Sequence, residues 1–138
     1  MISFETRNEN LEILDLEELA DRDAAETYRL IEYVNRYLGG TRVVLTHLEN
    51  FSSSWPKDRP IQILDVGCGS ADIPRSIASW AKENGFLVSI TALDSSRPAL
   101  RYAKEKSLLY PEISWIQANA TRLPFQRHSF LRCLQRRV

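Results

Sequence analysis

The stretch Ile63-Leu64-Asp65-Val66-Gly67-Cys68-Gly69-Ser70-Ala71-Asp72-Ile73-Pro74 decides the fold of this 138-residue chain. An apolar run ends there in an acid and in two glycines that stand one residue apart, and a segment with the pattern of an amphipathic helix follows at once. This order predicts a buried strand that turns sharply into a helix, with bare backbone where side chains would block a ligand. At such a turn we expect the unpaired N–H groups of the helix start to face a polar, nucleotide-like ligand.

The spacing of the small residues narrows the choice of ligand. A dinucleotide-binding turn has a third Gly or Ala three residues after its second glycine, where this chain has Asp72. A carboxylate in the first helical turn would repel a pyrophosphate. A P-loop is excluded because no Gly-Lys-Ser/Thr follows. A cofactor without phosphates that carries an amine, a sulfonium, a ribose and an adenine fits better, with Asp65 near its cationic end and the backbone of Gly67 and Gly69 close to it.

Three segments resemble the motifs of one enzyme family. Residues 65–71 are similar to the first motif of class I S-adenosylmethionine-dependent methyltransferases, Asp/Glu-x-Gly-x-Gly-x-Gly, with alanine in place of the third glycine. Residues 90–96 resemble the second strand of that family, which ends in the acid that holds the ribose. Residues 115–120, followed by Leu-Pro-Phe at 123–125, resemble the third strand and its adenine-contacting loop. The resemblance implies S-adenosylmethionine as cofactor and S-adenosylhomocysteine as product.

The same resemblance implies which residues bind the cofactor. Asp94 would hold the ribose hydroxyls, and the amide oxygen of Asn119, where the family commonly has Asp, would accept a hydrogen bond from the adenine amino group. No catalytic residue and no metal ligand is assigned. The expected cofactor-binding residues are Asp65, Gly67, Cys68, Gly69, Asp94, Ser95, Asn119 and Ala120.

Several of these residues also have a purely structural interpretation. Asp94 would alternatively cap the following helix, with Pro98 in its first turn. Asp65 would alternatively cap the glycine turn. Cys68 is interpreted as a packing residue rather than a nucleophile, because no histidine lies close in sequence to activate its thiol. Neither histidine of the chain has a partner at the spacing of metal ligands.

The pattern of apolar residues predicts an α/β chain with helices at its start. A helix over 16–38 is expected to stop at Gly39 and Gly40, and Thr41 is expected to N-cap a second helix. A turn-rich linker follows at 51–60. Strands and helices then alternate, which favours a parallel sheet. The strands are expected near 61–66, 87–93 and 113–118, and the helices near 71–84 and 96–109.

These elements predict a Rossmann-like, doubly wound parallel sheet, of which the chain contains only the N-terminal, cofactor-binding half. We expect a helical segment at 1–51 and a partial S-adenosylmethionine-binding domain at 60–138. The helical segment would either act as a lid over the cofactor, hinged at the double glycine, or only cover a face of the sheet.

Composition limits the classes of partner and compartment. Two cysteines, Cys68 and Cys133, do not make a disulfide framework, so we expect a reducing compartment, the cytoplasm. The chain begins without the apolar core of a signal peptide and has no run long enough to span a membrane. Its net charge is zero. Neither the acidic first part nor the arginine-rich end has the basic and aromatic surface of a nucleic-acid binder. We therefore expect a small-molecule acceptor, and neither nucleic acid nor a membrane.

The end of the sequence departs from the family pattern. Residues 123–130 resemble the stretch that introduces the fourth strand, but the next acid is absent and arginines interrupt the apolar run. We hypothesise that the chain is truncated, through a frame change just after Phe130. A first strand without a neighbour on its far side has an open edge, so a marginal monomer or an edge-paired homodimer is expected.

Three functions remain open from the sequence. The favoured one is methyl transfer from S-adenosylmethionine to an oxygen or carbon of a small molecule, of the type that similar enzymes use in quinone and polyketide pathways. The second is a non-catalytic cofactor-binding or interaction module. The third is a nicotinamide-dependent oxidoreductase, which Asp72 disfavours.

Overall fold

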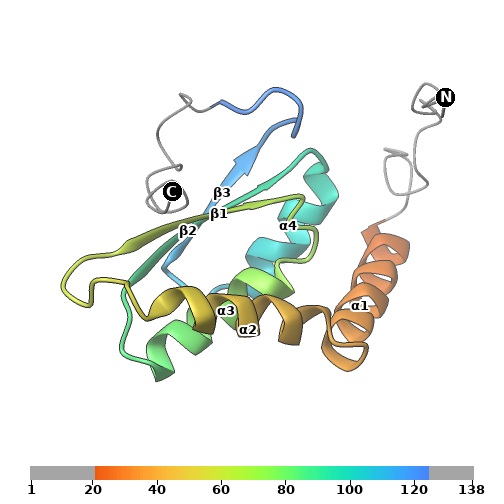
Figure 1. The fold of residues 1–138 in the computed structure, drawn as a ribbon. Helices are drawn as coiled ribbons and strands as arrows, with labels where there is room; N and C mark the ends of the chain where they lie inside the picture. The colour runs from red at the N-terminus through yellow and green to blue at the C-terminus, as the bar shows by residue number, and fades with distance from the viewer. Residues whose placement is uncertain (1–20, 125–138) are drawn as a thin grey trace, which may run out of the picture.

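The computed structural model describes residues 21–124, in which helices and strands follow one another in the predicted order (Figure 1). The predicted strands and helices from residue 61 onward are confirmed to within three residues at each end. The first predicted helix is described from residue 21 onward. The elements are α1 (Asp21–Tyr37), α2 (Gly40–Ser52), β1 (Ile61–Val66), α3 (Asp72–Glu83), β2 (Val88–Asp94), α4 (Arg97–Lys106) and β3 (Ile113–Gln117).

The three strands form a parallel sheet in the order β1-β2-β3. The register places Ile61 opposite Val88, and Ile90 opposite Ile113. Because all strands run in the same direction, their carboxyl ends meet at one edge of the sheet. In the described part of the chain β1 is an outer strand, as the sequence predicts.

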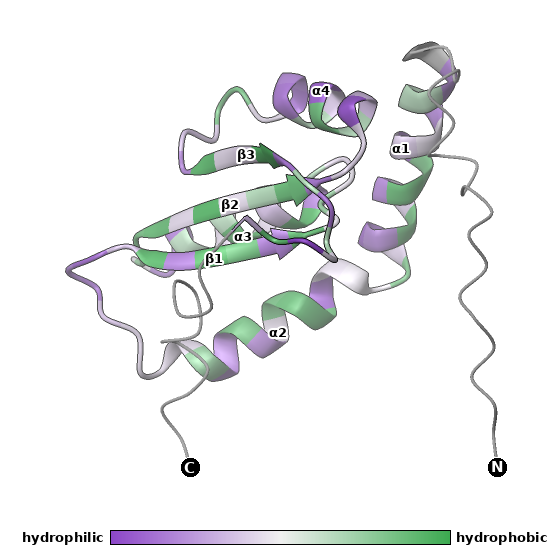
Figure 2. Ribbon diagram, turned by 90° about the horizontal axis from the view of Figure 1, so that it is seen from above, coloured by the Kyte–Doolittle hydropathy of each residue, from purple (hydrophilic) through white to green (hydrophobic). Residues whose placement is uncertain are grey.

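One face of the sheet packs against α3 and α4. Ile90 and Ala92 of the central strand are completely buried there, against Ile77, Ala78 and Leu100 of the two helices. Figure 2 looks onto the opposite face, which no helix within residues 21–124 covers. The described residues therefore form the sheet and one helical layer of a Rossmann-like α/β fold.

Local sequence explains where the helices begin, with two corrections. Ser96 is the N-cap of α4, because its Oγ accepts from the Ala99 N–H at 3.3 Å and Pro98 lies in the first turn. The alternative of Asp94 as this cap is therefore wrong. The expectation that Thr41 caps α2 is also wrong. That helix begins at Gly40 without a side-chain cap, because Gly39 takes the left-handed conformation (φ +92°) and turns the backbone directly into the helix.

The segment between α2 and β1 contains an aromatic anchor. Trp55 packs edge-on against Trp80 and Phe86, with ring centroids 6.1 and 5.7 Å apart, and the latter two rings stack on each other. Val44, Leu45 and Leu48 of α2 pack against the same core. The helical segment and the sheet thus share one hydrophobic core. The turn-forming residues of the linker between them gave no indication of this shared core.

Candidate cofactor-binding site

The turn after β1 has an unusual backbone. Gly67 and Gly69 have φ angles of +76° and +51°, which side chains disfavour. A Cβ atom added to either glycine would meet no heavy atom within 4 Å. Backbone conformation, and not crowding by the protein, therefore requires glycine at both positions, and the space in front of them is open.

Ala71 replaces the third glycine of the motif at a position that also needs a left-handed backbone. Its φ is +58°, and no other non-glycine residue between 21 and 124 has a positive φ. The left-handed conformation costs an alanine about 1–2 kcal/mol. The N–H of Ala71 donates to the Cys68 carbonyl at 2.7 Å, and its methyl group is completely buried at the start of α3.

The amides of the turn are directed into the protein. The N–H groups of Gly67 and Cys68 donate to the Leu93 carbonyl at 2.7 and 3.0 Å, and the Gly69 N–H donates to Asp94 Oδ2 at 2.8 Å. The expectation that unpaired N–H groups of this turn face the ligand is therefore wrong for these residues. The reason is that the left-handed turn folds its amides back onto the end of β2. Such a turn has no free N–H groups at residues 67–69 to bind a phosphate, which agrees with the prediction of a cofactor without phosphates.

Asp94, the last residue of β2, connects two loops. Its Oδ2 accepts from Gly69 and its Oδ1 accepts from the Ser96 N–H, each at 2.8 Å. A carboxylate has about four acceptor positions, so about two remain for a ligand. The neighbouring Ser95 is exposed, and its carbonyl accepts from Gln117 Nε2 at 3.2 Å.

Asp65 carries a charge that the described part of the chain does not compensate. It lies partly buried near the end of β1, and no group within residues 21–124 donates a hydrogen bond to its carboxylate. Burial, followed by the negative charges of Asp72 and Asp94, raises the pKa of Asp65 to about 6. Within that range no three His, Cys, Asp or Glu side chains are grouped to hold a metal ion. The Asp65 carboxylate is therefore open to a positively charged partner.

The environment of Cys68 disfavours the thiolate form of its side chain. The residue is buried, and burial together with the charges of Asp94 and Asp65 raises its pKa to about 12. A thiolate is the reactive form of cysteine, so this side chain is not a nucleophile at neutral pH. The structural interpretation of Cys68 agrees with this environment.

Asn119 follows β3 and begins a tight turn of its own. Its Oδ1 accepts from both the N–H and the hydroxyl of Thr121, each at 2.9 Å. Both lone pairs of the amide oxygen are thereby used, and the NH₂ group is left to donate. The predicted role of this oxygen as acceptor for adenine does not fit this conformation. The Ala118 N–H donates to the Asp94 carbonyl at 3.0 Å, which places the loop with Asn119 and the exposed Ala120 beside the end of β2.

The carboxyl edge of the sheet thus brings the predicted residues together in a line. Asp65 and the glycine turn follow β1, Asp94 follows β2, and Asn119 follows β3. Two pockets of about 440 and 470 Å³ lie away from this edge, between α1, α2 and α3. The larger pocket is bordered by Asp72, which lies next to the glycine turn.

Sequence reasoning missed the side chains that support this edge from α1 and α3. Asn35 Nδ2 donates to Asp72 Oδ2 at 3.0 Å, and Ser70 Oγ donates to Asp72 Oδ1 at 3.2 Å. Arg75 pairs with Glu32 at 2.7 Å. The polar residues on the inner side of an otherwise amphipathic α1 were the signal that could have pointed to them.

Comparison with known proteins shows the family of the chain. Residues 63–136, more than half of the chain, match a family described as a methyltransferase domain. The chain belongs to that family. The resemblance of its three motifs to class I methyltransferases is thereby confirmed.

Curated relatives of this chain include quinone methyltransferases. The chain is 41% identical over 71 residues to the ubiquinone/menaquinone biosynthesis C-methyltransferase UbiE of Rickettsia bellii, an alignment that covers 49% of this chain and 29% of that protein. It is 39% identical over 67 residues to the demethylmenaquinone methyltransferase of Bacillus licheniformis, covering 49% and 28%. The chain thus spans less than a third of the length of these relatives.

Among solved structures, the methyltransferase domain of the citrinin polyketide synthase matches with a TM-score of 0.51 and 23% identity, over 56% of this chain and 21% of that one. This similarity concerns the fold alone. Within residues 21–124 no helix is both long enough and apolar enough to cross a membrane.

Proposed function

We propose that this chain binds S-adenosylmethionine along the carboxyl edge of its sheet and serves methyl transfer to a small molecule. The observation that supports this most directly is the uncompensated carboxylate of Asp65, with Asp72 and Asp94 beside it. Such a site attracts a ligand with positive charge at one end. A dinucleotide, which has a negative pyrophosphate at its centre, would be repelled there.

The linear order of the strand ends matches the linear order of groups in the cofactor. In the proposed arrangement Asp65 faces the cationic amino-acid end, in the open space before Gly67 and Gly69. The free acceptor positions of Asp94, together with Ser95, bind the ribose hydroxyls. Asn119 and Ala120 border the adenine, with the Asn119 NH₂ group donating to a ring nitrogen. Cys68 supports the turn from within the core.

When bound, the cofactor supplies a methyl group on a sulfonium for in-line transfer. The contribution of this chain is binding and orientation: the residues above hold the two ends of the ligand so that the sulfonium has one defined position. We assign no catalytic residue. The acceptor is proposed to be a small molecule of the quinone class, methylated on carbon or oxygen, because the relatives named above act in quinone biosynthesis.

Calorimetric titration with S-adenosylhomocysteine, with NADH as control, tests this proposal. We expect saturable binding of S-adenosylhomocysteine alone at pH 7.5. The affinity is expected to fall below about pH 6, because protonation of Asp65 removes the charge that pairs with the ligand's ammonium group. Binding of NADH alone would support the oxidoreductase, and no binding of either ligand would contradict a cofactor site at this edge.

A second candidate function is a cofactor-binding module without catalysis. It is distinguished by incubating the chain with labelled S-adenosylmethionine and a panel of quinols and phenols. Transfer of label supports the enzyme, whereas binding without transfer to any acceptor supports the module.

The outer position of β1 supports a proposal about assembly. Within residues 21–124 no strand pairs with its outer edge, whose backbone groups are available to a second copy, so we propose a homodimer paired along Ile61–Val66 in the cytoplasm. Light scattering is expected to give twice the mass of one chain. A Pro substitution at Gln62, which is exposed on this strand, should restore the monomer.

A further inference from the structure

Three side chains on one face of α1 are directed at the loops of the cofactor site. Tyr28, Glu32 and Asn35 are spaced by four and three residues, so they lie in a row along the helix. The strand arrows in Figure 2 point toward α1, which lies beyond the carboxyl edge of the sheet. The row contacts α3 and α4, the helices that follow β1 and β2, and Ser96 in the loop before α4.

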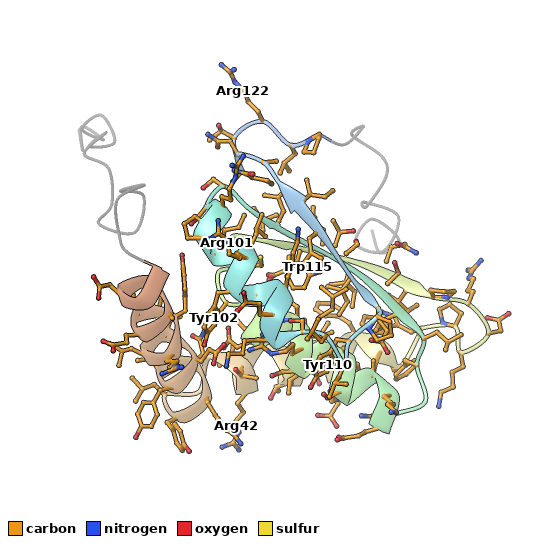
Figure 3. All side chains as sticks on the ribbon, turned by 180° about the vertical axis from the view of Figure 1, so that it is seen from behind. Arg42, Arg101, Tyr102, Tyr110, Trp115 and Arg122 are labelled. Atoms are coloured by element: carbon orange, nitrogen blue, oxygen red, sulfur yellow. The ribbon has the colours of Figure 1, made fainter. Side chains whose placement is uncertain are left out.

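The first two residues of the row contact α4, α3 and the N-cap of α4. Tyr28 is buried, packs its ring against Tyr102 of α4 at 5.5 Å, and lies 3.4 Å from Ser96 Oγ through its hydroxyl. Figure 3 shows Tyr102 extending from α4 toward α1. Glu32 pairs with Arg75, whose guanidinium also donates to the Ser70 carbonyl at 2.7 Å. These contacts fasten α1 next to both the glycine turn and the loop after β2.

The third residue contacts Asp72, whose charge lies close to that of Asp65. Asn35 Nδ2 donates to Asp72 Oδ2 at 3.0 Å, while Ser70 Oγ donates to the other oxygen. A Cβ atom on Gly40 would lie 3.0 Å from Asn35 Oδ1, which is closer than most such contacts. Gly40 thus leaves room for the Asn35 amide, and a larger residue at this position would crowd it.

We infer that Asn35 is a positioning residue of the cofactor site, which orients the Asp72 carboxylate and through it fixes the glycine turn and the charge around Asp65. The inference rests on the proposed function. Asn35 need not touch the cofactor for this role. Without its hydrogen bond, Asp72 keeps only the Ser70 hydroxyl as a side-chain donor within residues 21–124 and is free to rotate with respect to Asp65.

The test compares four proteins in titrations with S-adenosylhomocysteine: wild type, Asn35→Ala, Asn35→Asp and the exchanged pair Asn35→Asp/Asp72→Asn. Loss of the hydrogen bond in Asn35→Ala is expected to weaken binding about tenfold. Asn35→Asp is expected to weaken it further, because two carboxylates then face each other. The exchanged pair restores one amide and one carboxylate, so its affinity should return to within about threefold of wild type.

Two controls separate positioning from general destabilisation. Arg36→Ala changes the next residue of the same helix, which makes no hydrogen bond or ion pair with the site loops within residues 21–124, and should leave the affinity unchanged. Amide hydrogen exchange without ligand should become faster at Gly69 in Asn35→Ala and stay as in wild type in Arg36→Ala.

The outcomes distinguish this inference from the proposed function. The positioning role is wrong, while the cofactor site stands, if Asn35→Ala and Asn35→Asp both bind S-adenosylhomocysteine as tightly as wild type does. The same conclusion follows if the exchanged pair binds no better than Asn35→Asp alone. If wild type does not bind S-adenosylhomocysteine, both are wrong.

Discussion

The two ends of the parallel sheet are built in opposite ways. At the amino end Trp55, Trp80 and Phe86 form an aromatic cluster, and Lys57 Nζ lies 5.1 Å above one of its rings. At the carboxyl end there are a strained alanine, a partly buried carboxylate without a donor in the described residues, and loops joined by hydrogen bonds. The same strands therefore begin in an apolar cluster and end in polar, strained loops.

This contrast shows how stability and function are divided in the fold. Aromatic packing needs no particular charge and stabilises the sheet wherever it occurs. The partly buried carboxylate of Asp65 and the left-handed Ala71 lower the stability of the ligand-free protein, and a cationic ligand would compensate the charge of Asp65. Residues that break local rules in this way are expected at functional sites. The predictions below test this division.

The largest effect is expected for Asp94→Ala at the carboxyl end. The change leaves the Gly69 and Ser96 amides without their acceptor and removes the proposed ribose ligand. We expect about a hundredfold weaker S-adenosylhomocysteine binding and a loss of about 2 kcal/mol in the free energy of unfolding. Calorimetry and urea denaturation measure the two effects, and unchanged affinity would contradict the ligand site.

Phe86→Leu at the amino end should show the reverse pattern. Loss of the stacked ring next to Trp80 is expected to lower the free energy of unfolding by about 1.5 kcal/mol. The affinity for S-adenosylhomocysteine should remain within twofold of wild type in the same assays. A matching loss of affinity would mean that the two ends are not independent.

Asp65→Asn is expected to stabilise the empty protein while it weakens binding. The pKa of Asp65 is raised from 3.8 to about 6 in the folded chain, so the folded state binds the proton more tightly than the unfolded state. The free energy of unfolding of the wild type should therefore decrease as the pH rises from about 4 to 6. In the variant this decrease should be absent. At pH 7.5 we expect the free energy of unfolding of Asp65→Asn to exceed that of wild type by about 1–2 kcal/mol, a value already lowered to account for the partial exposure of the side chain. Ligand binding by the variant should be about tenfold weaker. A variant that is less stable at pH 7.5 would contradict the proposed environment.

The smallest effect is expected for Asn119→Asp. Thr121 occupies both lone pairs of the present amide oxygen, but a carboxylate has further acceptor positions for the adenine amino group. We expect about threefold tighter S-adenosylhomocysteine binding, and no gain for an analogue that lacks the 6-amino group. Equal gains for both ligands would indicate a general effect of charge.

Much of the fold follows from local sequence signals. The apolar run 61–66, the glycines after it and the acid at 94 predicted strand ends and a turn that the structure confirms. These signals are strong because strand periodicity and positive φ depend on residues that are adjacent in the chain. The prediction that Thr41 caps α2 was wrong because the left-handed backbone of Gly39 sets the start of that helix.

The sequence by itself determined the α/β class, the position of the glycine turn and which acids end the strands, because each depends on neighbouring residues. Only the tertiary structure decided how those residues are used. The amides of the turn bond to Leu93 and Asp94, Thr121 occupies the oxygen of Asn119, and Asn35 reaches Asp72 from 37 positions away. These contacts join segments that are separated in the chain, and the physical reason is that packing of α1, α3 and the sheet, and not local propensity, brings their polar groups within hydrogen-bonding distance.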